Sequence, residues 1–259
     1  MLDITYPFIL LSLISRIECE MEPFVVGGSD TKVKKFPHSV FLNIFCEDQA
    51  NGYIIPWICG ASIVNENIIL TAAHCLASCG SRSIITVSVG HMNMLKGAEY
   101  TVHSYLIHDL YDRNQAYCDL ALSKVSTALK FNGRVKRVAL MPAPPYFEAA
   151  QVAGWGLIDE ERNEKAKVLQ FVNQVVWKTN ECRQLIQTLS KGAICASSGN
   201  EYSYASGGDS GSALVVRGYI QIGIVSYKMP KVSRSLVVYT DTGYFYDWIR
   251  KNARRLYCV

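Results

Sequence analysis

The sequence predicts an all-β protein, built as a sandwich or a pair of barrels, with one helix at its C-terminal end. Short apolar runs recur from Ser39 onward, and turn-forming Gly, Asn, Asp and Pro residues separate them. Aromatic residues repeat at helical spacing only near the C-terminus. The chain has 259 residues, 49% of them hydrophobic, which is enough for one large domain or two small ones.

The expected elements lie on both sides of a proline-rich segment. We expect strands at 40–45, 68–71, 84–89, 168–176, 220–225 and 236–240. Residues 139–146 contain three prolines and are interpreted as an extended linker between two halves. The expected helix follows residue 243, and we interpret its four basic residues as a solvated face rather than a binding patch (Arg250, Lys251, Arg254 and Arg255).

The cysteines indicate an oxidising compartment. The chain has nine of them, with no CxxC pair and no matching ligand pair that would complete a zinc site, so disulfides are expected and a metal is not. The apolar run 8–14 resembles the core of a signal peptide and is too short to span a bilayer. The sequence therefore predicts a secreted protein without a membrane anchor.

The charge of the chain is moderate. The formal net charge is +4, and removing residues 1–24 leaves 25 basic and 18 acidic residues, a net charge of +7. A solvated basic surface explains this excess, and no pattern indicates nucleic-acid binding.

Three short motifs supply the residue types that nucleophilic catalysis needs. Ser210 lies in GGDSGSA, His74 in TAAHC and Asp119 in CDLAL. A serine hydroxyl is a weak nucleophile unless a base lies beside it and donors await the oxyanion. Each motif alone has a purely structural interpretation, but together, in this order, they point to catalysis. The chain resembles the chymotrypsin-like serine protease family.

The resemblance covers about residues 25–258 and implies a fold. It implies two six-stranded antiparallel β-barrels packed face to face, with the active site in the cleft between them. The first barrel would span about 25–139 and the second about 140–243, followed by a helix at about 244–257. The motif Gly154-Trp155-Gly156 matches a landmark of the second half.

The resemblance also implies a role for each catalytic residue. His74 would act as the general base, Asp119 would orient its ring, and Ser210 would attack the scissile carbonyl to form an acyl-enzyme. The backbone N–H groups of Gly208 and Ser210 would form the oxyanion hole. No metal or organic cofactor is expected.

The segment that begins at Val25 resembles the N-terminus released when zymogens of this family are cleaved. The freed α-amino group of Val25 would pair with Asp209 and order the oxyanion hole. Residues 1–24 would then be a signal peptide and short pro-segment. Phe24 precedes the junction, so either the activating protease accepts a large apolar residue, or processing begins elsewhere.

The predicted substrate pocket departs from that of trypsin. The resemblance implies that Tyr204 stands at the pocket floor, where an aspartate would select lysine or arginine. Lys228 and Val237 stand where small glycines keep the walls open, and Ser226 would support Asp119. We therefore expect a shallow pocket that prefers a small or modest apolar side chain before the scissile bond.

Four disulfides are expected. The first two pairs named below are implied by the resemblance. Four other cysteines remain in a chain that starts at Val25. We expect one bond among them to join two loops that border the cleft, and the other to tie the C-terminus to the strand of Asp119. The four pairs are Cys59–Cys75, Cys182–Cys195, Cys46–Cys79 and Cys118–Cys258.

Two other function classes stay open. A protease homologue with weak turnover could act as a binding or regulatory module, because the pocket is obstructed and Phe24 is unusual at the junction. An esterase could use the same triad, although GxSxG hydrolases carry the serine before the histidine. The expected partners are protein or peptide substrates, protein inhibitors and an activating protease. Neither nucleic acid nor membrane is expected as a partner, and the protein is expected to be a monomer.

Overall fold

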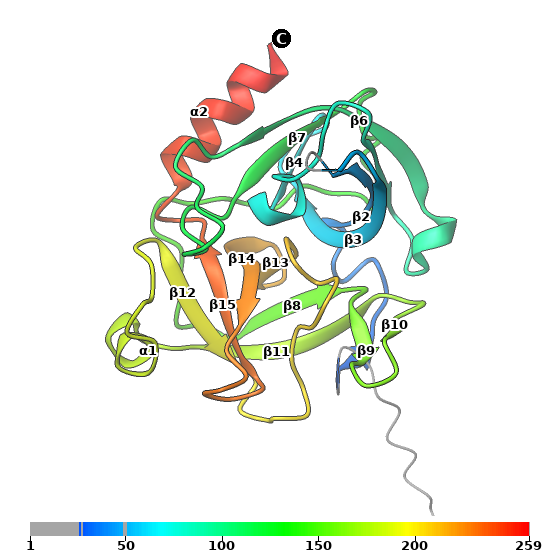
Figure 1. The fold of residues 1–259 in the computed structure, drawn as a ribbon. Coiled ribbons are helices and arrows are strands. Elements are labelled where there is room, and N and C mark those ends of the chain that lie inside the picture. Colours follow the sequence, from blue (N-terminus) through cyan, green and yellow to red (C-terminus); the bar gives the residue numbers. More distant parts are fainter. Residues whose placement is uncertain (1–25, 27, 49–50, 259) are drawn as a thin grey trace, which may run out of the picture.

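The structure consists of two closed β-barrels and a C-terminal helix (Figure 1). It is a computed structural model, and it describes residues 26, 28–48 and 51–258. The expected all-β fold with two six-stranded antiparallel barrels is therefore confirmed. The expected leader and the residue Val25 lie outside the described residues.

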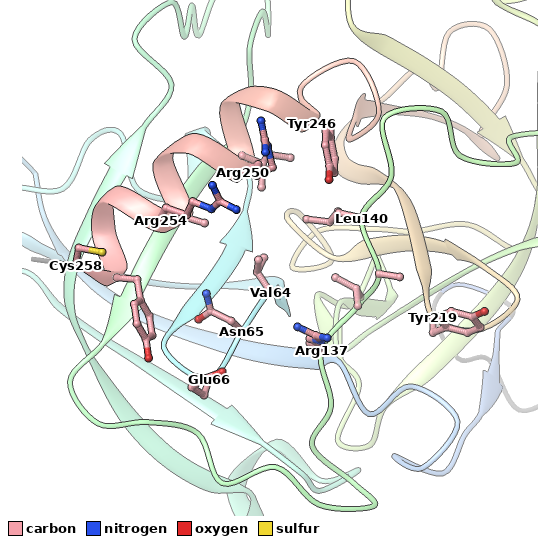
Figure 2. A pocket seen from close by; sticks show the side chains of 15 residues that line it. Val64, Asn65, Glu66, Arg137, Leu140, Tyr219, Tyr246, Arg250, Arg254 and Cys258 are labelled. Atoms are coloured by element: carbon pink, nitrogen blue, oxygen red, sulfur yellow. The ribbon is translucent and has the colours of Figure 1, made fainter.

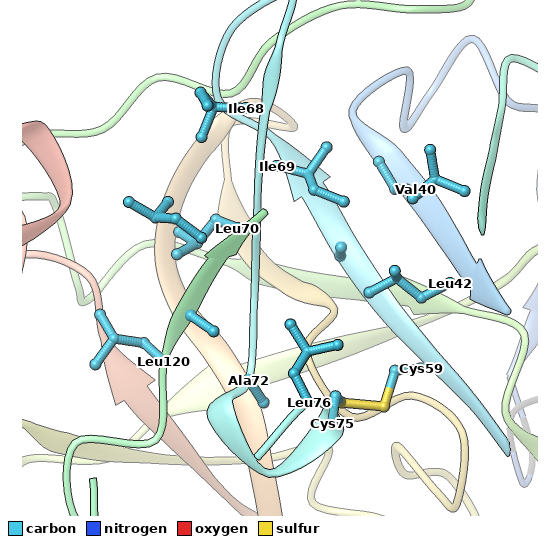
Figure 3. Close-up of a cluster of buried hydrophobic side chains, with 14 of the residues drawn as sticks. Val40, Leu42, Cys59, Ile68, Ile69, Leu70, Ala72, Cys75, Leu76 and Leu120 are labelled. Atoms are coloured by element: carbon cyan, nitrogen blue, oxygen red, sulfur yellow. A yellow bond between two sulfur atoms is a disulfide. The ribbon is translucent and has the colours of Figure 1, made fainter. Parts of the chain in front are cut away.

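The first barrel is closed by six antiparallel strands in the order β2-β3-β4-β7-β6-β5. Its interior is filled by branched aliphatic side chains that are fully buried, such as Leu42, Ile69 and Leu70 (Figure 3). Its strands are β2 (Ser39–Glu47), β3 (Ile54–Ile63), β4 (Ile68–Thr71), β5 (Ile84–Val89), β6 (Ala98–Ile107) and β7 (Ala121–Val125).

The second barrel closes because β8 pairs with both β11 and β13. The short strand β1 (Ser29–Asp30) extends its sheet along β11, and β9 (Leu157–Asp159) forms a separate hairpin with β10 (Glu164–Lys165). The barrel strands are β8 (Ala150–Gly154), β11 (Gln170–Val176), β12 (Ala193–Ser197), β13 (Ala213–Val216), β14 (Ile220–Lys228) and β15 (Leu236–Asp241).

Helices are few in the described chain. The longest is α2 (Tyr246–Tyr257), which inserts Ile249 and Ala253 into the core of the first barrel. The others are α1 (Thr179–Leu185) and two 3-10 turns, η1 (Ala73–Cys75) and η2 (Met94–Lys96). Within the described residues, no helix is both long and apolar enough to cross a membrane.

Hydrogen bonds join the two barrels directly. Ser62 Oγ on β3 donates to Gln221 Oε1 on β14 over 2.7 Å, and both groups are buried. Thr240 Oγ1 on β15 donates to the carbonyl of Asp119 over 2.8 Å. These bonds connect residues more than 100 positions apart, so they fix the barrel that carries Asp119 against the barrel that carries Ser226.

Three of the four expected disulfides are present, and the fourth is absent. Cys46–Cys79, Cys59–Cys75 and Cys182–Cys195 are bonded. The expected Cys118–Cys258 pair is wrong, because both thiols are free. Cys118 is buried in the first barrel core, whereas Cys258 is exposed just beyond the last turn of α2, so the two side chains occupy different surroundings.

Candidate active site

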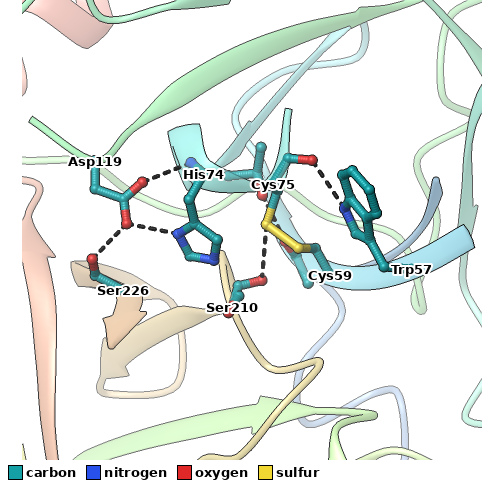
Figure 4. The surroundings of a disulfide bond; sticks show 9 residues. Trp57, Cys59, His74, Cys75, Asp119, Ser210 and Ser226 are labelled. Carbon is teal, nitrogen blue, oxygen red and sulfur yellow. Dashed lines mark hydrogen bonds and ion pairs between the residues drawn. A yellow bond between two sulfur atoms is a disulfide. The ribbon is translucent and has the colours of Figure 1, made fainter. Parts of the chain in front are cut away.

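Asp119 binds His74 through two hydrogen bonds (Figure 4). The backbone N–H of His74 donates to Oδ1 over 2.9 Å, and ring atom Nδ1 lies 2.8 Å from Oδ2. Ser226 Oγ, from the second barrel, donates to the same Oδ2 over 2.5 Å. The carboxylate therefore fixes both the backbone and the ring of the histidine.

The charge state of Asp119 defines the tautomer of His74. Burial raises the pKa of Asp119, but the hydrogen bonds from His74 and Ser226 outweigh this effect, so the pKa lies below its usual value. An ionised carboxylate only accepts hydrogen bonds, so Nδ1 of His74 must carry the proton. The other ring nitrogen, Nε2, is then free to accept a proton on a side chain that is 31% exposed.

The turn that carries His74 is held from two sides. The disulfide Cys59–Cys75 ties η1 to β3, and Trp57 Nε1 donates to the carbonyl of Cys75 over 3.1 Å. Cys75 Sγ also lies 3.8 Å from the carbonyl oxygen of Ser210, which brings the serine turn against the histidine turn (Figure 4). The cluster Cys59, His74 and Cys75 offers no metal site, because its two sulfur atoms are bonded to each other.

The serine turn is organised by the buried carboxylate of Asp209. Its Oδ1 accepts the N–H of Gly156 over 2.8 Å, and its Oδ2 accepts the N–H of Ser206 over 2.9 Å. A Cβ on Gly156 would lie 2.5 Å from the carboxyl carbon, so glycine is required there and the GWG motif has a physical reason. Burial raises the pKa of Asp209 to about 6 despite these bonds.

Ser210 is held between the two barrels by its backbone. The N–H of Gly60, on β3, donates to the carbonyl of Ser210 over 2.7 Å, and the N–H of Gly211 donates to Val225 over 2.8 Å. Gly208 has φ +97°, a conformation that side chains other than glycine rarely adopt. This turn places Ser210 on the second barrel and beside the His74 turn of the first.

Two of the four residues of the expected substrate pocket, Tyr204 and Lys228, contact Glu160, which sequence reasoning missed. Tyr204 Oη donates to Glu160 Oε2 over 3.3 Å, and Ser206 Oγ donates to Oε1. Lys228 Nζ forms an ion pair with Oε1 and lies 4.8 Å from the centre of the Tyr204 ring. Val237 is fully buried.

This network makes the wall of the expected pocket charged. Burial raises the pKa of Glu160, but the bonds from Lys228 and Ser206 lower it more, so the carboxylate is ionised at neutral pH. Tyr204, Lys228 and Glu160 also line a cavity of about 330 Å³, together with Val26. No local pattern in the acidic, polar stretch around Glu160 signals a pocket residue, because its partners lie 44 to 68 positions away.

The expected activation pair is described on one side only. Asp209 is present as above, whereas Val25 lies outside the described residues. The next residue, Val26, accepts a 3.0 Å hydrogen bond from the N–H of Tyr204, which fixes that part of the chain beside the pocket network.

Comparisons with known proteins agree with this architecture. The model of the family described as Trypsin matches residues 25–249. Trypsin delta of Drosophila melanogaster is 31% identical over 242 residues, which cover 90% of each chain. Cathepsin G of Mus musculus is 29% identical over 96% of this chain and 93% of its own. The solved HL collagenase superposes with a TM-score of 0.76 at 24% identity, covering 87% of this chain and 97% of that chain.

The fold and these matches define a hydrolase of the serine endopeptidase class. The chain belongs to the trypsin family.

Proposed function

We propose that the protein is a secreted endopeptidase that hydrolyses peptide bonds through Ser210, His74 and Asp119. The observation that carries this proposal is the buried Asp119 carboxylate, which binds the ring and backbone of His74 and the hydroxyl of Ser226. Because Nδ1 of His74 donates to Asp119, Nε2 remains an acceptor beside the turn that carries Ser210. A general base requires this arrangement.

In the proposed reaction, Nε2 of His74 takes the hydroxyl proton as Ser210 Oγ attacks the carbonyl carbon. The N–H groups of Gly208 and Ser210 stabilise the oxyanion, and each such donor contributes about 2.7–4 kcal/mol to the transition state. His74 then gives its proton to the leaving amine, and an acyl-enzyme remains. Water, deprotonated by His74, cleaves the ester and restores the serine hydroxyl.

We propose that cleavage between Phe24 and Val25 activates the protein. Residues 1–24 would be the signal peptide and pro-segment, and residues 25–259 the peptidase domain. Asp209 supports this proposal, because a carboxylate buried to 1% exposure gains most from an added ammonium partner. The activator must accept Phe24, and the mature protein is expected to act as a monomer on protein substrates and to meet protein inhibitors.

The proposed specificity is unlike that of trypsin. Tyr204 carries no charge for lysine or arginine, the Lys228 ammonium repels both, and Glu160 is already paired. We expect a small or modest apolar side chain before the scissile bond. Profiling with a peptide library tests this expectation, and a preference for Arg or Lys would contradict it.

One observation favours a second function, that of a protease homologue with weak turnover that acts as a binding or regulatory module. The side chains of Glu160, Lys228 and Tyr204 bond to one another where a substrate side chain would enter. A pocket that is filled by its own residues can bind a partner without processing it.

Labelling with a fluorophosphonate probe distinguishes the two functions. The probe is applied to the full precursor and to protein that starts at Val25, with Ser210→Ala as the control. Labelling of the Val25 form alone, lost in the variant, supports the activatable protease. A folded Val25 form that does not react would favour the binding module.

A further inference from the structure

The described part of the chain has a second cavity, of about 800 Å³, between helix α2 and the segment that joins the two barrels (Figure 2). None of Ser210, His74, Asp119 or the Glu160 network lines it. Its size falls within the range of about 300–1,000 Å³ that is usual for ligand sites. The function proposed above leaves this cavity without a role.

Arginines occupy opposite walls of the cavity. Arg250 and Arg254 lie four residues apart on α2 and therefore share one face of the helix. Arg137 faces them from the segment that leads into the linker (Figure 2). From the sequence, the four basic residues of this helix are interpreted as one solvated face. Two of them, Arg250 and Arg254, line the cavity, whereas Lys251 and Arg255 do not.

The positive charge of the cavity is largely uncompensated. Among the described residues that line it, Glu66 is the only acidic one. Arg250 has one weak ion pair, with Asp247 at 3.7 Å on an exposed carboxylate. No carboxylate in the described residues forms an ion pair with Arg137 or Arg254, so two guanidinium groups are available for an added anion.

The floor of the cavity is apolar and fixed in place. The backbone N–H of Val138 donates to the carbonyl of Ile63 over 2.9 Å, and that of Ala139 donates to the carbonyl of Tyr219 over 2.8 Å, so the start of the linker is held to both barrels. Apolar and aromatic side chains complete the floor and rim, among them Val64, Leu140, Ile249, Ala253, Tyr246 and Tyr257. The hydrogen bonds of Val138 and Ala139 fix the backbone along one side of the cavity.

We propose that this cavity is a docking site for a peptide segment of a partner protein in which acidic residues flank an apolar side chain. Guanidinium groups bind carboxylates through paired, parallel hydrogen bonds, which gives the acids defined positions on the two walls. The apolar floor takes the side chain between them. A sulfated sugar chain would satisfy the arginines but would leave that floor without a partner, so the peptide fits the site better.

The test measures binding of a fluorescein-labelled peptide, Glu-Asp-Leu-Asp-Glu, to the full chain carrying Ser210→Ala, by fluorescence anisotropy. Replacing the central Leu by Gly tests the apolar floor, and replacing the acids by Gln and Asn tests the arginines. The variant Arg137→Glu/Arg254→Glu alters the cavity, and the matched control Lys251→Glu/Arg255→Glu makes the same charge change outside it.

We expect the cavity variant to bind the peptide at least about tenfold more weakly than the control, and both peptide changes to weaken binding to the unaltered chain. Equal losses in the two variants would overturn the proposal, because they indicate attraction by net charge alone. Absence of peptide binding to the unaltered chain would also overturn the proposal. So would displacement of the peptide by a heparin hexasaccharide, if replacing the central Leu of the peptide has no effect on its binding. Equal thermal unfolding temperatures show that both variants are folded.

Discussion

Asp119 is the residue on which the geometry of the site depends most. Its carboxylate is nearly inaccessible, and its side chain meets groups from both barrels. If the charge is removed, His74 and Ser226 lose the ionised oxygen that both bind. The position of the imidazole therefore depends on this acid and on the turn that carries it.

The substitution Asp119→Asn is expected to lower kcat by about 10⁴-fold with little change in fold, because an amide can stabilise the wrong tautomer of His74. A loss of this size is typical of a Ser-His-Asp triad whose aspartate is replaced by asparagine. The measurement is the rate of acylation of the Val25 form. Asp109→Asn, which removes a charge from an exposed position, is the control and should leave the rate unchanged.

The buried carboxyl of Asp209 is expected to make the free energy of unfolding depend on pH. In the precursor no α-amino group exists at Val25, and burial raises the pKa of Asp209 from 3.8 to about 6. Between these values the folded state binds a proton that the unfolded state does not. The free energy of unfolding therefore falls as pH rises from about 4 to about 6, by up to about 3 kcal/mol.

Denaturant unfolding of the Ser210→Ala precursor across this pH range checks the prediction. The further substitution Asp209→Asn should remove the slope, since an amide does not titrate. In the Val25 form the new ammonium favours the ionised carboxylate, so the slope should shrink or reverse. Identical slopes in precursor and Val25 form would contradict the proposed activation pair.

At the scale of elements, each disulfide of the described residues ties a strand to a turn or a helix. Cys46–Cys79 joins β2 to the turn after η1 and closes a separation of 33 residues. The paired replacement Cys46→Ala/Cys79→Ala is expected to lower the free energy of unfolding by about 2–4 kcal/mol, measured in urea.

The free cysteine Cys258 offers the matched control for that experiment. It is exposed beyond α2, so Cys258→Ser should change the unfolding free energy by less than about 0.5 kcal/mol. A loss as large as that of the paired replacement would show that Cys258 is bonded in solution and would contradict the structure.

The strands show which elements a sequence can and cannot reveal. The strands expected at 68–71 and 84–89 match β4 and β5, because their apolar runs are buried and bounded by turn residues. β3 was not expected, since Pro56 interrupts its pattern. β6 was missed because its mixed side chains are all exposed or half-buried, and α1 because Cys182 is its single buried residue.

The candidate site likewise contains some residues that the sequence reveals and others that it does not. The frames around Ser210, His74 and Asp119 are local motifs, so they could be found without a structure. Glu160 could not, because its role arises from partners on distant segments. The bond expected to tie the C-terminus to the aspartate strand, Cys118–Cys258, is wrong, because the sequence alone does not show that Cys118 is buried while Cys258 is exposed.

At the scale of the whole molecule, the candidate site depends on the position of one barrel relative to the other. His74 and Asp119 belong to the first barrel, and Ser210 and Ser226 belong to the second. The bond from Gly60 N–H to Ser210 crosses this boundary. A small change at the boundary should therefore alter catalysis as well as stability.

Gly60→Ala tests this dependence. An added Cβ would lie 1.9 Å from Ser212 Oγ and 3.1 Å from the Ser212 backbone, so the serine turn must shift. We expect a loss of about 1–3 kcal/mol in unfolding free energy, together with slower fluorophosphonate labelling. Gly133→Ala is the control, because nothing lies within 4 Å of its added Cβ. Unchanged labelling in Gly60→Ala would contradict the proposed coupling.

The distribution of the disulfides has a practical consequence. Among the described residues, Cys46–Cys79 and Cys59–Cys75 both lie within the first barrel and Cys182–Cys195 lies within the second, so no covalent bridge spans the two apart from the linker itself. The chain is therefore suited to being divided at residues 139–146 into two separately produced fragments. Neither fragment holds all three of the proposed catalytic residues, so fluorophosphonate labelling that returns on mixing would report reassembly of a split enzyme.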